Sequence, residues 1–248
     1  MGTLLGIASL LVAGVTTGLW WRGIQAVNLP RDRTRFFMAW GMALAFGFAA
    51  WFHAPGWIGG GAAALGMLLG GMFLGLGAVS GQESRTPAVA VGGAMLDFSA
   101  QSDSGEVFSS TDLAGRPYLL KFFRGHRCPY SVAELRRWEE LRPELEARGI
   151  QIVTLSTDTP EEIRKSRGNH GVQATMLSDA DLSVTDRFNL RNQTNITPGG
   201  IRPMPIPTTF LVDAQGILRW IDQATDDQVR SDPSRVLAAI EANLGAES

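Results

Sequence analysis

Long apolar stretches without charge fill the first third of the chain. Residues 1–21 contain no charged side chain, and residues 36–82 contain no Asp, Glu, Lys or Arg, although the turn-forming run HAPG at 53–56 interrupts them. A helix of roughly 20 residues, rising about 1.5 Å per residue, crosses the ~30 Å hydrocarbon core of a bilayer. The pattern therefore predicts a transmembrane module in residues 1–82, with helices at about 4–21, 36–52 and 57–79.

The charges between these helices predict how the module lies in a membrane. The first loop, RGIQAVNLPRDRTR, holds four arginines and one aspartate, whereas HAPG holds no permanent charge. Because arginine-rich loops stay on the cytoplasmic side, we expect the first loop and the C-terminal domain to face the cytoplasm, and the N-terminus and the HAPG hairpin to lie outside. One miscounted crossing would move the C-terminal domain to the periplasmic side. A cleaved signal peptide would need basic residues before its apolar stretch, and MGTLLG has none.

Glycines recur through the third predicted helix. The pairs Gly66 and Gly70, and Gly71 and Gly75, have the G-x-x-x-G spacing that lets helices approach closely in lipid. Dimerisation of two chains is one interpretation. We favour packing within the three-helix module.

Strand and helix patterns alternate in residues 94–248, after a linker at 83–93 that contains Gly, Ser, Thr and Pro. This order is typical of an α/β domain whose sheet contains parallel strands. Arg191 to Pro205 is predicted only as a loop. The elements expected are strands at 118–123 (YLLKFF), 151–157 (QIVTLST), 208–212 and 217–221, and helices at about 128–148, 160–169 and 233–244.

Composition excludes several classes of function. The chain has 22 Lys and Arg against 24 Asp and Glu, and no basic run, so nucleic acid is not an expected partner. Its single cysteine, Cys128, cannot form a disulfide within the chain. Three histidines and one cysteine form no metal-ligand spacing, so neither a metal nor another cofactor is expected. Asp179 and Asp181 are interpreted as turn and helix caps.

Several segments together resemble a known family. They occur in the expected order over about residues 94–244, and they are similar to the redoxins of the AhpC/TSA group, which includes the peroxiredoxins. The resemblance implies a thioredoxin-like fold and an antioxidant oxidoreductase active in cell redox homeostasis, here with a membrane module and so in a bacterial inner membrane. The segments are LDFSAQSDSGEVFSSTDLAGRPYLLKFFRG, RGHRCPYSVAEL, TLSTDTPEEI, MLSDADLSVTDRFNL and PTTFLVDAQG.

The segment RGHRCPYS carries the candidate chemistry. Cys128 follows a predicted strand and Pro129 suits the first turn of a helix, so backbone N–H groups, the helix dipole, Arg124 and Arg127 favour a thiolate. The resemblance is to a subgroup with RG-x-x-CPYC, in which Cys128 matches the first cysteine and Ser131 replaces the second. An inert buried cysteine is the alternative.

The neighbours of Cys128 admit more than one role. The Ser131 hydroxyl could hydrogen-bond the thiolate, or Ser131 could open a helix capping box with Glu134. Arg124 could stabilise an anionic transition state or only cover the surface, and we favour the former. Tyr130 and His126 are expected to form walls of the site.

Two departures from the peroxiredoxin pattern concern activation of the substrate. The family signature P-x-x-x-T-x-x-C would place Pro at 121 and Thr at 125, where this chain has Lys121 and Gly125. Ile206-Pro207-Thr208 resembles the thioredoxin version of the strand entry, which has a cis proline beside the cysteine. The resemblance thus adds Pro129, Tyr130, Pro207 and Thr208 as substrate-contacting residues.

Three hypotheses follow. The first is a membrane-anchored peroxidase in which Cys128 attacks a peroxide and an external thiol, such as glutathione or a thioredoxin-like protein, regenerates it. The second is a monothiol oxidoreductase that exchanges with disulfides, because CPYS resembles a glutaredoxin CPYC without its second cysteine. The third is a catalytically silent redoxin fold that serves as a scaffold for a membrane partner.

Overall fold

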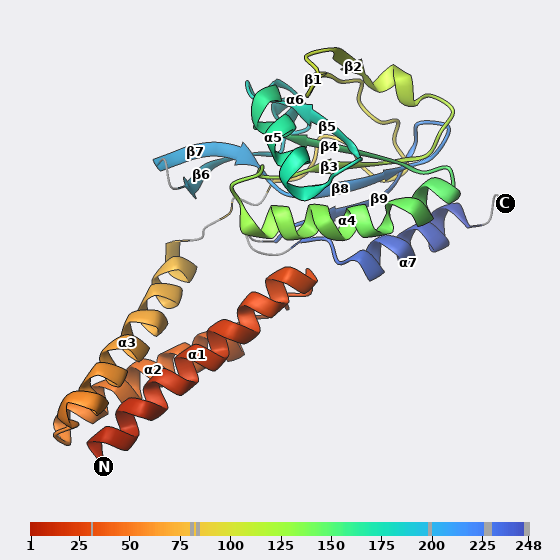
Figure 1. Cartoon of the computed structure of the whole chain (residues 1–248). Helices are drawn as coiled ribbons and strands as arrows, with labels where there is room; N and C mark the ends of the chain where they lie inside the picture. Colours follow the sequence, from red (N-terminus) through yellow and green to blue (C-terminus); the bar gives the residue numbers. More distant parts are fainter. Residues whose placement is uncertain (31, 80–81, 83–84, 198–199, 226–229, 246–248) are drawn as a thin grey trace. The chain divides into compact units, whose positions relative to one another are not determined.

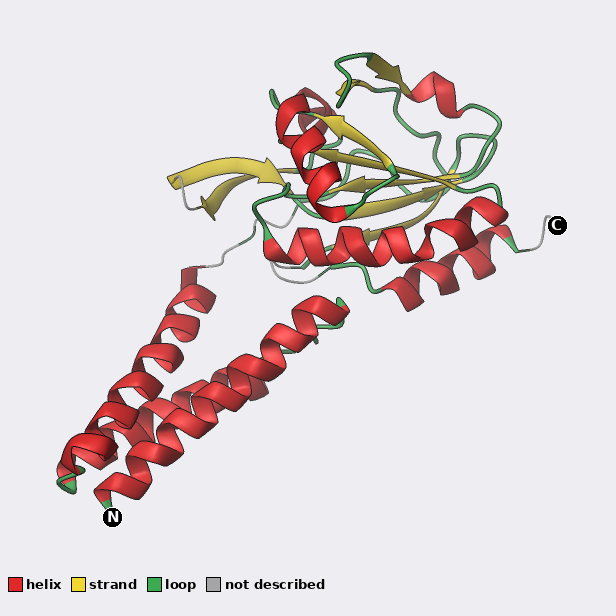
Figure 2. Ribbon diagram, in the orientation of Figure 1, coloured by secondary structure: helices red, strands yellow, loops and turns green. Residues whose placement is uncertain are grey.

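The computed structural model describes residues 1–30, 32–79, 82, 85–197, 200–225 and 230–245. The chain divides into two compact units, Met1–Gly81 and Gln82–Ser248 (Figure 1). The first consists of helices, and the second contains the described strands together with further helices (Figure 2).

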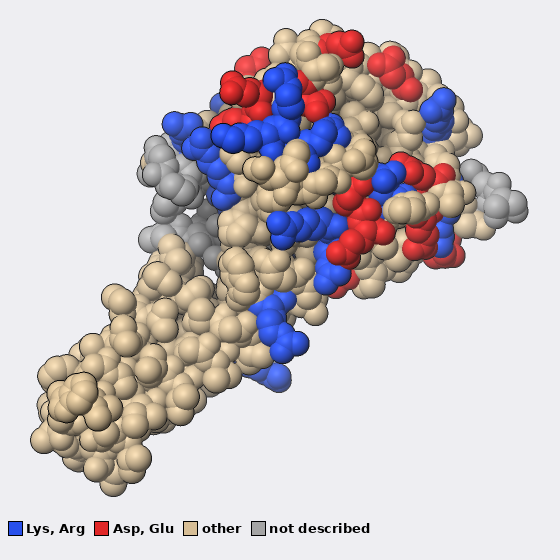
Figure 3. Space-filling view, viewed as in Figure 1, with Lys and Arg blue, Asp and Glu red and all other residues tan. Residues whose placement is uncertain are grey.

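Three long helices form the first unit, as predicted: α1 (Gly2–Ala26), α2 (Thr34–Phe52) and α3 (Gly56–Val79). By length and composition each could cross a membrane. On the face shown in Figure 3 this unit is uncharged except at one end, whereas charges are spread over the second unit. α1 extends beyond the predicted range: Arg22 to Ala26 continue the helix, which stops where Val27 adopts a left-handed conformation.

Small residues let the three helices pack closely. The buried Ser9 of α1 donates a hydrogen bond to the carbonyl oxygen of Ala43 in α2 (2.7 Å). A Cβ atom on Gly66 would lie 2.3 Å from Ser9 Oγ, and one on Gly70 would lie 2.9 Å from the Trp40 carbonyl oxygen. The first G-x-x-x-G pair is therefore used inside the module, while a Cβ on Gly75 would meet nothing within 4 Å.

The second unit is built on a seven-stranded sheet in the order β2-β1-β5-β4-β3-β8-β9. β3, β4 and β5 are parallel, and the other neighbours are antiparallel. The strands are β1 (Ser99–Ser102), β2 (Val107–Ser109), β3 (Tyr118–Phe122), β4 (Gln151–Ser156), β5 (Thr175–Ser178), β8 (Thr208–Val212) and β9 (Leu218–Gln223).

Helices cover both faces of this sheet. Because side chains alternate along a strand, Leu119 of β3 packs on one face and Leu120 on the other. The Leu119 face is covered by residues of α4 (Pro129–Ala147), α5 (Pro160–His170) and α7 (Pro233–Leu244). The Leu120 face is covered by residues of the 3₁₀ helix η1 (Ser110–Leu113) and α6 (Ser183–Arg187), with Phe188 at its centre.

Two segments differ from the sequence-based predictions. Arg191 to Pro205, predicted as a loop, forms an antiparallel hairpin of β6 (Arg191–Thr197) and β7 (Gly200–Pro205). Part of the predicted linker is bound to the sheet unit: the Ala88 N–H donates to the Phe188 carbonyl oxygen and the Gly92 N–H to that of Leu218.

Asp179 holds the start of α6, as the sequence predicts, and Asp181 caps the same turn. The buried Asp179 carboxylate accepts hydrogen bonds from the N–H groups of Val184 (2.9 Å) and Thr185 (2.8 Å) and from the Thr185 hydroxyl. The exposed Asp181 accepts one from the Ser183 N–H (3.0 Å).

We expect Asp179→Ala to lower the free energy of unfolding by about 2 kcal/mol, because buried donors lose their acceptor. Asp181→Ala is the matched control and should cost clearly less, since the Ser183 N–H is exposed to water. Chemical denaturation of both variants measures the difference. Equal losses would contradict the assignment of Asp179 as the main cap.

Candidate active site

Cys128 lies at the junction of β3 and α4. It is the N-cap of α4, with an extended backbone, and Pro129 occupies the first helical turn. The Cys128 carbonyl oxygen accepts the Val132 N–H (3.0 Å), and the side chain is partly exposed. The sulfur is therefore placed at the positive end of a helix dipole, where a thiolate is favoured.

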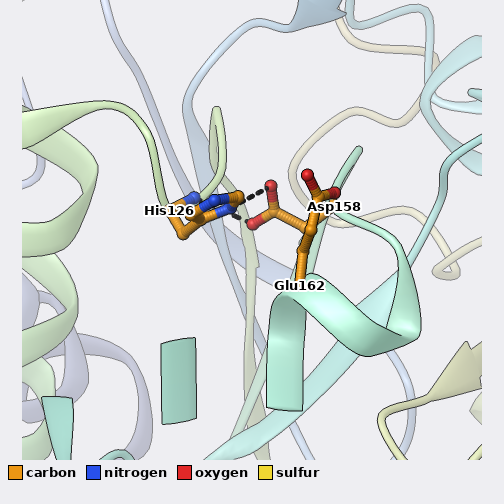
Figure 4. A group of neighbouring side chains, drawn as sticks. All are labelled: His126, Asp158 and Glu162. Atoms are coloured by element: carbon orange, nitrogen blue, oxygen red, sulfur yellow. Dashed lines mark hydrogen bonds and ion pairs between the residues drawn. The ribbon is translucent and has the colours of Figure 1, made fainter. Parts of the chain in front are cut away.

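A carboxylate clamps the loop that leads to Cys128. Asp158, which follows β4, accepts the His126 N–H (2.8 Å), and its other oxygen lies 2.9 Å from His126 Nδ1 (Figure 4). Gly125 has a φ of +95°, and a Cβ there would lie 2.4 Å from Asp158 Oδ1. The clamp explains why Gly125 replaces the family threonine: a side chain at 125 would occupy the space of the Asp158 carboxylate.

His126, Asp158 and Glu162 lie together, with one possible ligand atom from each within 4.8 Å of the others (Figure 4). Asp158 Oδ2 also accepts from Ser156 (3.2 Å), and Glu162 accepts the Thr159 N–H (3.0 Å) at the start of α5. The Glu162 carboxylate lies 3.2 Å from Arg127 Nη2. These contacts account for the three side chains as a brace for the loop, without a metal ion.

A residue that the sequence analysis did not single out touches the sulfur. Arg230 Nη2 donates to Cys128 Sγ (3.4 Å) and to Ser131 Oγ (3.4 Å), and its guanidinium carbon lies 5.7 Å from the centre of the Tyr130 ring. Arg230 is only 7% exposed and comes from the segment between β9 and α7. A guanidinium in this place stabilises negative charge on the sulfur.

Ser131 does not cap α4, so the predicted capping box is wrong. Pro129 starts the helix immediately after Cys128, which places Ser131 inside the first turn. Its buried hydroxyl accepts the Arg124 N–H (3.4 Å) and the Arg230 Nη2 hydrogen. Arg230 Nη2 donates to both Ser131 and Cys128. Among the described residues, no hydrogen bond joins the Ser131 hydroxyl to the Cys128 sulfur.

The two arginines of RGHRCPYS have different surroundings. Arg124 is 8% exposed, so covering the surface is not its role. Arg127 is 66% exposed and forms an ion pair with Glu162 at the start of α5. The sequence brings Arg124 into the interior beside Ser131 and leaves Arg127 on the rim; catalytic roles for both stay predictions.

Pro207 and Thr208 open β8 as buried residues. The Thr208 hydroxyl donates to the Ile206 carbonyl oxygen (3.0 Å). The described chain contains no cis peptide bond, so the expected cis proline at Pro207 is wrong. The Pro207 carbonyl oxygen accepts the Ala224 N–H (2.8 Å), extending the β8–β9 pairing by one step. Substrate contact by these residues stays a prediction.

Beneath the sulfur lies a buried group of charges that the sequence analysis did not assemble. Lys121 Nζ lies 2.7 Å from Glu134 Oε1, and both side chains are 2% exposed. Arg230 Nε lies 3.6 Å from Glu134 Oε2. Burial lowers the pKa of Lys121, and the Glu134 carboxylate opposes that shift. Lys121 occupies the position of the family proline; a lysine inside the apolar strand YLLKFF was the available signal.

The fold and the site define a thiol-dependent redoxin: a cysteine at the start of the helix that follows an inner strand of a thioredoxin-like sheet. The model of the AhpC/TSA family matches residues 91–221. The chain belongs to the AhpC/TSA family. Arg230 lies beyond the matched region, whereas Lys121, Cys128, Glu134 and Asp158 lie within it.

Curated relatives belong to two enzyme classes. Peroxiredoxin Bcp of Escherichia coli is 27% identical over 127 residues, which is 50% of this chain and 79% of that protein. The thiol-disulfide oxidoreductase ResA of Geobacillus kaustophilus is 26% identical over 154 residues, 62% of this chain and 79% of that protein. The chain is therefore an enzyme of the thiol peroxidase and thiol-disulfide oxidoreductase class.

Solved structures show the same fold. Peroxidoxin BcpB from Mycobacterium tuberculosis superposes with a TM-score of 0.53 and 21% identity, over 61% of this chain and 96% of that chain. A yeast mitochondrial 1-Cys peroxiredoxin gives a TM-score of 0.54 and 19% identity, over 64% and 78%. The thioredoxin-like fold predicted from the sequence is thus confirmed.

We expect Gly125→Ala to disrupt the site. The positive φ costs about 1 kcal/mol for a residue with a Cβ, and displacement of the Asp158 carboxylate adds to it. Gly105→Ala is the control, because Gly105 has a φ of +88° and open space around it. The thermal midpoint and the alkylation rate of Cys128 should both fall further in Gly125→Ala; equal effects would contradict the clamp.

Proposed function

We propose that this chain is a membrane-anchored thiol peroxidase that uses Cys128 as its single nucleophile. The observation that carries the proposal is the hydrogen bond from Arg230 Nη2 to Cys128 Sγ (3.4 Å) at the start of α4. It gives the only cysteine of the chain, whose side chain is partly exposed, a buried cationic partner, which suits a reactive thiolate better than an inert thiol.

The proposed cycle needs one sulfur from this chain and two from outside. The Cys128 thiolate attacks one peroxide oxygen; an S–O bond forms, the O–O bond breaks, and the leaving oxygen takes a proton to give an alcohol or water. An external thiol then attacks the sulfenic acid and releases water, leaving a mixed disulfide. A second external thiol frees Cys128 and leaves as the other half of a disulfide.

The residues around the sulfur have distinct parts in this cycle. Arg230 supports the thiolate and the negative charge that develops on the peroxide oxygens. Ser131 keeps Arg230 and the Arg124 backbone in register by accepting a hydrogen bond from each. Because Ser131 has no thiol, the sulfenic acid cannot be resolved within the chain, so the reductant must be external, such as glutathione or a thioredoxin-like protein.

Disulfide exchange is the second candidate. The similarity to ResA and the absence of a threonine at position 125 favour it, since peroxide activation through a threonine hydroxyl is not available. Cys128 would attack a disulfide, form a mixed disulfide and be released by an external thiol. This route uses the same thiolate and the same arginine.

Trapping the oxidised sulfur separates the two candidates. After hydrogen peroxide treatment of the purified full chain, we expect a sulfenic-acid trap to add to Cys128, and glutathione to restore the thiol. Intact-mass spectrometry measures both steps, and Cys128→Ser is the control that should gain no mass. A sulfur that stays reduced with peroxide but turns over glutathione mixed disulfides would replace the peroxidase with the exchange enzyme.

The helical unit supports the membrane part of the proposal. Large apolar side chains are exposed on its surface, where they would be unfavourable in water and suit a bilayer. The four arginines of residues 22–35 favour a cytoplasmic position for that segment, and with three crossings the redoxin unit follows it to the same side. The exposed residues include Leu4, Leu11, Leu19, Phe48, Phe52, Trp57 and Leu68.

The lone cysteine is a probe for this orientation. We expect a membrane-impermeant maleimide to leave Cys128 unlabelled in intact spheroplasts and to label it after permeabilisation. A permeant maleimide is the control for reactivity, and alkaline carbonate should leave the chain in the membrane pellet. Labelling in intact spheroplasts would place the redoxin unit on the periplasmic side.

A further inference from the structure

A chain of buried charges connects β3 to the sulfur through α4. We define it as the buried ion chain: Lys121, Glu134 and Arg230. The Glu134 carboxylate lies between the two cations, 2.7 Å from Lys121 Nζ through Oε1 and 3.6 Å from Arg230 Nε through Oε2. Arg230 in turn reaches Cys128 Sγ with Nη2. Lys121 is therefore the nearer of the two cations to the carboxylate, and Arg230 is the one that contacts the sulfur.

A buried carboxylate takes up whatever cation is available, because leaving it uncompensated costs several kcal/mol. With Lys121 in place, Glu134 Oε1 is paired at 2.7 Å, whereas Oε2 has no hydrogen-bond partner and lies 3.6 Å from Arg230 Nε. Without Lys121, the carboxylate would draw the Arg230 guanidinium from 3.6 Å into hydrogen-bonding distance. The same guanidinium would then be withdrawn from the Cys128 sulfur.

Hydrogen bonds tie Lys121 to the segment that carries Arg230. Lys121 Nζ donates to the Thr209 hydroxyl (3.0 Å), which lies 2.7 Å from Ser231 Oγ. The Ser231 N–H donates to Glu134 Oε1 (3.2 Å). The remaining charge that acts on Lys121 is the buried Asp222, which lies 3.1 Å from Arg235.

We propose that Lys121 is a positioning residue for Cys128: by pairing with the Glu134 carboxylate, it leaves the Arg230 guanidinium in contact with the sulfur. This inference rests on the proposed function in that Cys128 is taken as the nucleophile. Lys121 pairs with Thr209 and Glu134, and within the described part of the chain no hydrogen bond or ion pair joins it to Cys128. Its effect passes through the Glu134 carboxylate.

Alkylation of Cys128 by iodoacetamide as a function of pH tests the proposal on the full chain in detergent. Lys121→Met removes the charge and keeps the length of the side chain. We expect about tenfold slower alkylation at neutral pH, which corresponds to an upward shift of the pH midpoint by about one unit. The matched control is Lys165→Met, because Lys165 is the other lysine of the chain and is exposed; it should leave the rate unchanged.

A second background separates positioning from a direct effect of the lysine charge. In a Glu134→Gln chain there is no carboxylate with which Lys121 can form an ion pair, so adding Lys121→Met should change the alkylation rate by less than about twofold. A direct charge effect would slow both backgrounds alike. The interaction between the two substitutions is what a double-mutant cycle measures.

Two further measurements keep the result decisive. Arg230→Met retains the Lys121–Glu134 pair but removes the guanidinium. Its alkylation rate is the lower limit that the rate of Lys121→Met should approach and not fall below. Near-ultraviolet circular dichroism checks that each variant is folded; should Lys121→Met not fold, the comparison in the Glu134→Gln background and the Arg230→Met limit remain.

The proposal is overturned if Lys121→Met alkylates within about twofold of the unsubstituted chain, or if its effect is the same in both backgrounds. Alkylation needs no peroxide, so this outcome is independent of the proposed activity. Cys128 could fail to form a sulfenic acid while the alkylation rates still show the expected interaction between Lys121→Met and Glu134→Gln. That result would refute the peroxidase and keep Lys121 as a positioning residue.

Discussion

The arrangement of the second unit depends on the ion pairs and the hydrogen bond that the buried Glu134 carboxylate forms. It joins three parts of the chain: Lys121 from β3, Glu134 itself from α4, and the Arg230–Ser231 segment that precedes α7. A charge so deeply buried is tolerated only when its partners are in place. These contacts hold together the sheet, the helix that begins at Cys128 and the segment before α7. The same contacts place Arg230 beside the Cys128 sulfur.

The loop before Cys128 is fixed from the other side by a second carboxylate. Asp158 binds His126 and fills the space that a side chain at Gly125 would need. The family threonine and this clamp are mutually exclusive, so the site relies on charge rather than on a hydroxyl at that position. Ser131 has the size of a cysteine but no thiol, so the proposed thiol cycle takes its second sulfur from a partner molecule.

Much of the fold could be predicted from the sequence, because its signals are local. Uncharged runs predicted α1 to α3, and the strand YLLKFF followed by Pro129 placed Cys128 at a helix start. Arg230 could not be found this way, since it is 102 residues from the cysteine in a polar segment without a motif. The S-x-x-E pattern at Ser131 and Glu134 suggested a cap, but Glu134 turns inward to Lys121, a choice that only tertiary packing decides.

The position of Arg230 also sets the order in which the site is completed. Chains are made from the N-terminus, and domains fold as their residues emerge from the ribosome. Helices α1 to α3 come first, Cys128 follows, and the arginine that contacts its sulfur is made 102 residues later. Until then the nascent Cys128 thiol lacks the guanidinium that contacts it in the folded unit, so this pair forms only after α4 and the strands of the sheet have been made.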